Sequence, residues 1–268
     1  MSEGLSGGWL SAIALGLVEG LSEFLPISST GHLIIAAHWL GENSESAKLF
    51  EVVIQLGAVL AVCWEYRRRL WNMAFAIGRP KSPDGQLAFV IFLAFLPAAF
   101  LGLLLHGVIK AHLFSPKTVA AALIVGGVAI LWVENLKISP RINTLNRLGF
   151  LDALVIGVAQ SLALFPGISR AGATIIGGML WGLERRCATE FSFLLALPTM
   201  FAAVAYDLWQ NQALLNWQIA ADIAIGFVVS FIVALIVIRA LLAYVSRHRF
   251  TPFGWYRIGF GLLVLAVL

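Results

Sequence analysis

The feature that most restricts the fold of this chain is a series of long windows almost without charge. Residues 87–108, 119–133 and 219–245 consist almost entirely of apolar side chains. About 20 apolar residues cross the hydrocarbon core of a bilayer as a helix, and the alternating strands of an outer-membrane barrel are missing from the pattern. Only 12% of the residues are charged, whereas soluble domains carry about 25%. The sequence therefore predicts an all-α integral membrane protein.

An apolar segment near the start of the chain is interrupted by a polar joint. The string EGLSEFLPISSTGH (residues 19–32) holds two carboxylates, a run of hydroxyls and an imidazole, and Pro26 ends the helix before it. The helical pieces expected on either side, residues 9–25 and 30–40, are short for a bilayer span. Such a break is tolerated at membrane depth only where it is buried in protein or lines a wet cavity. The pattern predicts a re-entrant helix-loop-helix hairpin, and ionisable groups in it indicate a functional site.

The same pattern returns later in the chain at a constant offset. Setting Gly16 over Gly157, an offset of 141 residues, aligns GLVEGLSEFLPISSTGHLIIAAHWLG with GVAQSLALFPGISRAGATIIGGMLWG without a gap. Corresponding interrupted segments in two halves indicate a binding site at the interface of an inverted repeat. We expect a first repeat at residues 1–136, a linker at 137–148 and a second repeat at 149–268. Each repeat would contain one re-entrant hairpin and three spans, which makes an inverted-topology bundle with six spanning helices.

The basic residues predict how the two halves are oriented. Three spans in each half is an odd number, so the halves must have opposite orientations, and the loops then separate onto two sides. One side holds Lys48, Lys110 and Lys117; the other holds Arg67, Arg68, Arg69, Arg79, Lys81, Lys137, Arg141, Arg147, Arg185, Arg186, Arg247 and Arg249. Because positive residues favour the cytoplasm, both termini are expected to face outward and the two hairpin tips to meet within the bilayer. The net charge of +4 therefore indicates membrane orientation, and no nucleic-acid partner is expected.

The second joint, PGISRAGAT (residues 166–174), places a cation at membrane depth. Arg170 needs an anionic partner there, and its planar fork suits a carboxylate or a phosphate. A permanent ion pair with Glu19 or Glu23 would satisfy it equally well, and a ligand could displace such a pair.

Glu19 and Glu23 are spaced to lie on one face of a helix, about 5–6 Å apart. Two carboxylates at that spacing in a low dielectric repel each other, so a divalent cation, Arg170 or a retained proton must reconcile them. Oxygen ligands of this kind fit a hard ion such as Mg²⁺ or Ca²⁺ that also bridges to a phosphate.

Hydroxyls and an imidazole stand where the second half-helix of the first hairpin begins. Ser28, Ser29 and Thr30 are natural N-caps at a helix terminus that can bind an anion, and His32 follows, placed to transfer a proton near neutral pH. Under the repeat, the acids, hydroxyls and imidazole lie in one half and the cation in the other. That division favours diphosphate hydrolysis, and a transporter or flippase of a lipid phosphate is the alternative.

These motifs resemble the bacterial undecaprenyl-diphosphate phosphatases, also called bacitracin-resistance proteins. The resemblance covers essentially the whole chain and is carried by the two joints together with FEVVIQLG (residues 50–57) and EFSFLLA (residues 190–196). In one departure, Ala171 stands where the family usually has Ser. The resemblance implies a metal-dependent hydrolase, often dimeric, on the outer face of the bacterial cytoplasmic membrane. It would remove the terminal phosphate of a long-chain (C55) prenyl diphosphate, regenerate the carrier for peptidoglycan synthesis and confer bacitracin resistance.

The residues and the resemblance together assign roles to individual side chains. Ser29 is expected to be the nucleophile or a substrate clamp, His32 the general acid and base, and Arg170 the group that holds phosphoryl oxygens. The full expected set is Glu23, Ser29, His32 and Arg170 for catalysis, Ser28, Thr30, Ser169 and Thr174 for substrate binding, and Glu19 and Glu23 for the divalent metal. A direct attack by water, with Ser29 only hydrogen-bonding, stays open, as does activation of a hydroxyl or water by Glu23.

Overall fold

The computed structural model describes residues 5–42, 44–79, 81–112, 115–210 and 217–267. Within them the regular elements are helices, with one isolated bridge between Ile142 and Leu183, so the predicted all-α class is confirmed. The α-helices are α1 (Gly8–Ser22), α2 (Ser29–Leu40), α3 (Glu45–Glu65), α4 (Arg67–Ala76), α5 (Pro83–His112), α6 (Pro116–Asn135), α7 (Phe150–Ser161), α8 (Arg170–Leu180), α9 (Arg185–Gln210), α10 (Trp217–Val245) and α11 (Thr251–Val267). Two 3₁₀ turns lie at Leu145–Arg147 and Leu162–Leu164.

Several of these helices can cross a membrane. In the described residues, α5, α6, α9 and α10 are long and apolar enough, and α3 with α4 would make a fifth span if the bent pair is counted as one. With 17 residues, α11 is shorter than the about 20 residues of a typical span. A multi-pass membrane protein is therefore supported, and the count of six spans stays a prediction.

One helix was not expected from the sequence. The sequence predicts a loop at Arg67, Arg68 and Arg69, yet residues 67–76 form α4, which is bent by 79° from the helix before it. Met73 and Ala76 are buried, whereas Trp71 and Phe75 are exposed. The exposed aromatic side chains and the adjacent arginines give α4 the character of a helix lying in a membrane interface.

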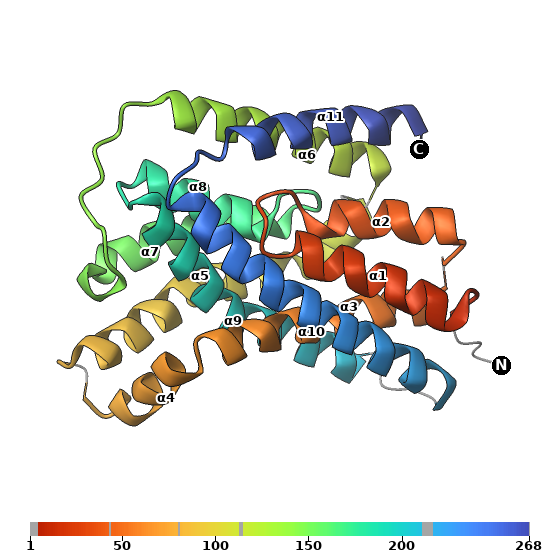
Figure 1. Cartoon of the computed structure of the whole chain (residues 1–268), viewed down its shortest axis with the longest axis horizontal. Helices are drawn as coiled ribbons and strands as arrows, with labels where there is room; N and C mark the ends of the chain where they lie inside the picture. Colours follow the sequence, from red (N-terminus) through yellow and green to blue (C-terminus); the bar gives the residue numbers. More distant parts are fainter. Residues whose placement is uncertain (1–4, 43, 80, 113–114, 211–216, 268) are drawn as a thin grey trace.

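The helices pack in pairs that are not neighbours along the chain. Helix α1 lies along α10, α7 lies along α5, and α6 packs against α11 (Figure 1). Two glycines permit the first two contacts: a Cβ at Gly16 would lie 2.6 Å from the Gly226 carbonyl oxygen, and one at Gly157 would lie 2.5 Å from that of Ala94. Small residues of this kind let helix backbones approach closely in membrane proteins.

Both predicted helix interruptions are present. Helix α1 ends at Ser22 and α2 begins at Ser29, after Ser28 takes a left-handed φ of 74°. In the second half, Gly167 has a φ of 91°, and Ser169 caps α8 by accepting a hydrogen bond from the Gly172 amide at 3.0 Å. The two loops lie in the middle of the molecule, while the linker lies at the left end of the view and both termini at the right (Figure 1).

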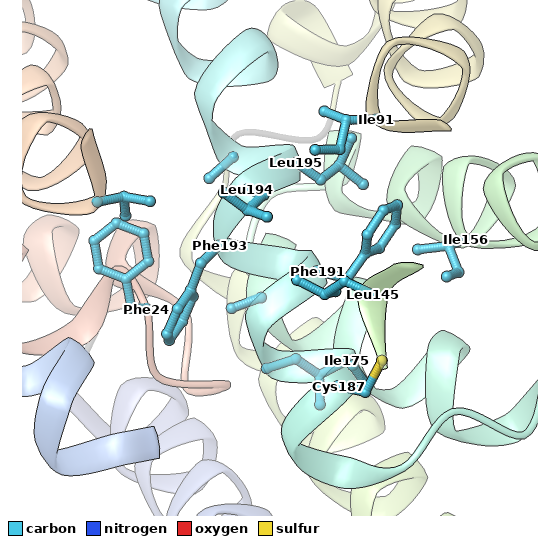
Figure 2. Close-up of a cluster of buried hydrophobic side chains, with 14 of the residues drawn as sticks. Phe24, Ile91, Leu145, Ile156, Ile175, Cys187, Phe191, Phe193, Leu194 and Leu195 are labelled. Atoms are coloured by element: carbon cyan, nitrogen blue, oxygen red, sulfur yellow. The ribbon is translucent and has the colours of Figure 1, made fainter. Parts of the chain in front are cut away.

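The largest buried cluster holds the first tip, which is the loop of residues 23–28 between α1 and α2. Phe24 is fully buried and contacts Phe193 edge-to-face at a centroid distance of 5.3 Å (Figure 2). Phe191, Leu194 and Leu195 of the same helix, α9, extend this cluster. Because Phe24 directly follows Glu23, its burial against α9 fixes where the carboxylate can point.

Candidate active site

The second tip is the loop of residues 165–169 before α8, and an ion pair connects it to the first tip. Arg170 at the start of α8 donates from Nη2 to Glu23 Oε1 at 3.2 Å and from Nη1 to the Ser192 carbonyl at 2.9 Å. Both charged side chains are nearly excluded from solvent, at 10% and 8% exposure, and the guanidinium lies 5.8 Å from the centre of the Phe24 ring. The carboxylate partner that the sequence required for Arg170 is therefore Glu23. Arg170 Nε is buried without a partner among the described residues.

Glu23 also receives the hydroxyl expected to be the nucleophile. Ser29, the first residue of α2, donates from Oγ to Glu23 Oε2 at 2.5 Å. Ser28 caps the same helix, with Oγ 3.5 Å from the Gly31 amide. Glu23 thus holds a hydroxyl on one oxygen and a guanidinium on the other.

These groups face a cavity of about 480 Å³. Its polar end includes Glu23, Ser28, Ser29, Thr30, Ser169 and Arg170. From there a mostly apolar arm runs between α5 and α9, lined by Phe95, Ala98, Ala99, Leu103, Met200 and Ala203, with Tyr206 and Asp207 following Ala203 along α9. An anionic head group with an apolar tail fits a cavity of this composition.

Glu19 lies one helical turn from Glu23 and does not line the cavity. Its side chain is fully buried and both carboxylate oxygens lack a hydrogen-bond partner among the described residues. Its charged neighbours are Glu23, Glu51 and Arg170. No group of three potential ligands from His, Cys, Asp and Glu occurs in the described part, but Mg²⁺ is commonly held by one or two carboxylates together with substrate phosphates. The unpartnered oxygens of Glu19 therefore fit a hard cation.

The remaining hydroxyls predicted to bind substrate lie in different places. Ser169 lines the cavity, and its Oγ also reaches the Leu25 carbonyl of the first tip at 3.4 Å. Thr174 does not line it; its Oγ1 contacts the Arg170 carbonyl at 2.8 Å and Ser192 Oγ at 2.6 Å. The Thr174 side chain therefore holds the second tip against α9.

His32 lies outside the cavity lining. Its Nδ1 is 2.7 Å from the Ser28 carbonyl and its Nε2 is 2.7 Å from the Tyr256 hydroxyl, and the ring stacks on Phe260 at 4.0 Å. A carbonyl only accepts, so Nδ1 carries the proton and Nε2 accepts from Tyr256. The general acid–base role expected for His32 stays a prediction: one ring nitrogen contacts the backbone carbonyl of Ser28, and the other is directed away from the cavity toward Tyr256 of α11.

Arg257 of α11 was not expected to contribute to the site. It is the largest fully buried side chain, and in the described residues no carboxylate pairs with it. Its guanidinium donates to the carbonyls of Pro26 at 3.2 Å and Gly167 at 3.1 Å, one on each tip. It also donates to two carbonyls of α6, those of Ala122 and Leu123. Arg257 therefore ties both tips to α6.

Comparison with known proteins gives the family. The family model described as "Bacitracin resistance protein BacA" matches residues 12–263. The chain belongs to this family. An "Undecaprenyl-diphosphatase" of Aromatoleum aromaticum is 52% identical over 255 residues, covering 95% of this chain and 93% of the relative. An "Undecaprenyl-diphosphatase 2" of Rhodospirillum rubrum is 55% identical over 260 residues, covering 96% and 94%.

The family match includes both helix interruptions and the residues around them. Every residue that contacts Arg170 or Arg257 falls within residues 12–263. The family indicated by the sequence motifs is therefore confirmed along the part of the chain that builds the cavity.

Proposed function

We propose that this chain hydrolyses undecaprenyl diphosphate to undecaprenyl phosphate and inorganic phosphate, which recycles the lipid carrier of peptidoglycan synthesis and gives resistance to bacitracin. The names of the bacterial relatives support this activity. The observation that carries it is the convergence of Arg170, Glu23 and Ser29 in one cavity. Arg170 Nε is there a buried donor with no partner among the described residues, and buried polar groups of this kind are normally satisfied.

The terminal phosphate is proposed to lie where two helices begin. The N-termini of α2 and α8 both face the polar end of the cavity through Ser29 and Arg170. Free amides and the helix dipole favour an anion there. Arg170 adds a guanidinium whose Nε can donate to a phosphoryl oxygen, and electrostatic stabilisation of this kind dominates phosphoryl transfer.

Glu23 is proposed to accept the proton of the attacking hydroxyl. Ser29 already donates to it at 2.5 Å, whereas His32 is directed toward α11. As Ser29 Oγ bonds to the terminal phosphorus, the bond from phosphorus to the bridging oxygen breaks and undecaprenyl phosphate leaves. Water then releases inorganic phosphate from the seryl ester. In the alternative route, Glu23 deprotonates a water that attacks directly while Ser29 binds the phosphate.

The lipid tail is proposed to leave the cavity along its apolar arm. The cavity of about 480 Å³ is far smaller than a C55 chain, so the tail must continue into lipid between α5 and α9. The arm runs from Ala98 to Leu103 and from Met200 to Ala203, toward the ends of these helices. By the distribution of basic residues those ends face outward. We therefore place the opening on the periplasmic side of the cytoplasmic membrane.

A divalent cation is proposed to be held by Glu19 and Glu23. Such an ion would supply positive charge that offsets the charge of the diphosphate.

We also propose the inverted repeat of six spans and two re-entrant hairpins. The matching helix pairs α1–α10 and α7–α5 support it, because in each pair the helix before the interruption in one half packs against a long span of the other half. The homodimer and the flippase alternative stay predictions, and the relatives' names favour the hydrolase.

Phosphate release from a long-chain prenyl diphosphate tests the proposal. The full chain, purified in detergent, is assayed with and without a chelator, together with Ser29→Ala and Glu23→Gln. Release that stops in Glu23→Gln and falls steeply in Ser29→Ala is expected. Activity of Ser29→Ala near wild type would assign the attack to water, and absence of release by the wild-type chain would refute the hydrolase. Lipid movement in vesicles that survives Glu23→Gln would favour the flippase.

A further inference from the structure

A second unpartnered donor belongs to a residue in the wall of the same cavity. Gln160 of α7 is only 1% exposed, yet its side chain lines the cavity and Nε2 has no hydrogen-bond partner among the described residues. Its Oε1 accepts from Thr199 Oγ1 at 3.3 Å, and the same hydroxyl lies 2.8 Å from the Leu195 carbonyl. The amide is therefore held from one end, and its buried N–H lacks the acceptor that such a group normally has.

Helix α9 shows where Gln160 lies along the cavity. Arg170 contacts α9 at Ser192, and Thr199 follows seven residues later, about 10 Å along the axis. Beyond Thr199 the helix lines the cavity with Ala203 of the apolar arm. Gln160 thus lies between the guanidinium and the arm. With the terminal phosphate at Arg170 and the tail in the arm, the other phosphate of a lipid diphosphate reaches Gln160.

We propose that Gln160 binds the phosphate that stays on the lipid, through a hydrogen bond from Nε2. This inference rests on the proposed function and names a further substrate-binding residue in it. When the bond between the terminal phosphorus and the bridging oxygen breaks, the electron pair stays on that oxygen, which departs with the lipid phosphate. An amide donor stabilises this developing charge. It adds no ion to a buried site that already contains an ion pair.

The amide is suited to this position in a way that a carboxylate is not. At the offset of 141 residues, Gln160 occupies the position of Glu19 in the first half. A glutamate at 160 would direct a negative charge at a dianionic phosphate, whereas glutamine of nearly the same shape offers a donor. The substitution Gln160→Glu therefore tests the hydrogen bond at nearly constant volume.

The experiment measures turnover and inhibition in the full chain purified in detergent. Gln160→Met and Gln160→Glu are compared with wild type for kcat and KM on a prenyl diphosphate, and for inhibition by a prenyl monophosphate and by inorganic phosphate. We expect kcat/KM to fall about 10- to 100-fold, as for loss of a hydrogen bond to a charged group. Inhibition by the prenyl monophosphate should weaken in parallel, while inhibition by inorganic phosphate, which needs only the Arg170 end, should not change.

Two further variants separate binding from folding. Ser161→Ala alters the next residue of the same helix, whose hydroxyl contacts the Gly157 carbonyl at 3.2 Å and does not line the cavity; it should behave as wild type. Thr199→Val removes the group that orients the amide, so it should weaken monophosphate inhibition less than Gln160→Met does. If Gln160→Met fails to fold, Thr199→Val and Gln160→Glu carry the same comparison.

Three results would overturn the inference. Gln160→Glu with wild-type kcat/KM would mean that the cavity needs no donor there. Equal weakening of both inhibitors would mean a general disturbance of the site. If the wild-type chain releases no phosphate, the proposed function falls separately, and calorimetric binding of the prenyl monophosphate to wild type and Gln160→Met still decides the role of Gln160: equal affinities would refute it.

Discussion

Replacing Arg257 by methionine should loosen both tips of the site at once. The guanidinium is buried in the middle of the molecule and donates to the carbonyls of Pro26 and Gly167. Methionine has a comparable length and no donor, so it removes the hydrogen bonds while largely filling the space. The substitution therefore isolates the connection between the tips from the packing of α11.

The size of the stability loss in Arg257→Met depends on which carbonyl acceptors are left without a hydrogen bond. In the described residues the Pro26 and Gly167 carbonyls accept no other hydrogen bond, and each orphaned buried acceptor costs about 1–3 kcal/mol. The Ala122 and Leu123 carbonyls lie inside α6, where the helix ladder also uses them, so they add little. Against this cost of about 2–6 kcal/mol stands the relief of not burying a cation. We expect a net loss of stability of about 1–4 kcal/mol.

Thermal unfolding in detergent and phosphate release from a prenyl diphosphate measure the two consequences. Arg257→Met should lower Tm and reduce kcat more than it raises KM, because the tips still bind phosphate but no longer hold it in register with Ser29. Arg239→Met is the matched control: Arg239 is 58% exposed and pairs with Glu65, and exposed pairs are worth at most about 1 kcal/mol. Arg257→Lys keeps the charge with fewer directed donors and should fall between them.

Arg257 would not connect the tips if Arg257→Met unfolded at the wild-type temperature with unchanged kcat. A lowered Tm with wild-type kcat in the surviving folded fraction would also contradict it, because the tips would then keep their register without the guanidinium. The connection between the tips is supported only if Arg257→Met lowers both Tm and kcat while Arg239→Met lowers neither.

Three other substitutions test separate parts of the structure. Gly167→Ala forces a side chain into a left-handed φ of 91° against the backbone of α6, which should cost about 1–3 kcal/mol and abolish phosphate release; a thermal melt like that of wild type would contradict this. Burial raises the pKa of Glu42, but hydrogen bonds from the Gly7 and Ser6 amides outweigh burial and hold it below its usual range. The stability from Glu42 is therefore complete above about pH 4.3 and lost as the pH falls through the lower folded-state value, so the Tm gap between wild type and Glu42→Gln should narrow below pH 4. His32→Gln should lower kcat but keep the acid limb of the pH profile of kcat/KM, because a carboxylate is the proposed base; loss of that limb would return the acid–base role to His32.

Much of the architecture could be predicted because its causes are local. Pro26 and the glycine of the second joint interrupt apolar segments where the structure has its two helix breaks, since proline and glycine act on the backbone of their own neighbourhood. The partner of Arg170 could be predicted in kind, because a guanidinium at membrane depth needs an anion. The choice of Glu23 over Glu19 depends on burial of Phe24 against α9, which the local sequence does not contain.

Residues held by the backbone of distant segments were missed. Arg257 lies in the last helix, far along the chain from both joints, and all its acceptors are carbonyls. Carbonyls occur at every residue, so no side-chain pattern marks the partners of such an arginine. The signal available in the sequence is a charge inside an otherwise apolar window. Only the structure shows that Gly126 lies beside it, where a Cβ would collide with the guanidinium.

The orientation of His32 shows why helical spacing alone does not place a side chain. Ser29 and His32 are three residues apart on α2, so they point about 60° from each other and both were expected to reach the site. Ser29 turns to Glu23, whereas the imidazole is stacked on Phe260 and hydrogen-bonded to Tyr256. Both aromatic partners come from α11, so the direction of the imidazole depends on packing between the two ends of the chain.

The charges around the tips explain why the two halves differ in sequence. Glu19, Glu23 and Glu51 lie together on the side of the first half, and Arg170 and Arg257 are supplied by the second. Either set alone would bury uncompensated charge, at a cost of several kcal/mol per ion, so each half requires the other and the site forms only where they dock. Three acids against two arginines leave one negative charge in excess, which disfavours binding of a diphosphate. A divalent cation would turn that excess into one positive charge, whereas a retained proton would only neutralise it, so this balance favours the proposed metal at Glu19 and Glu23 over a retained proton.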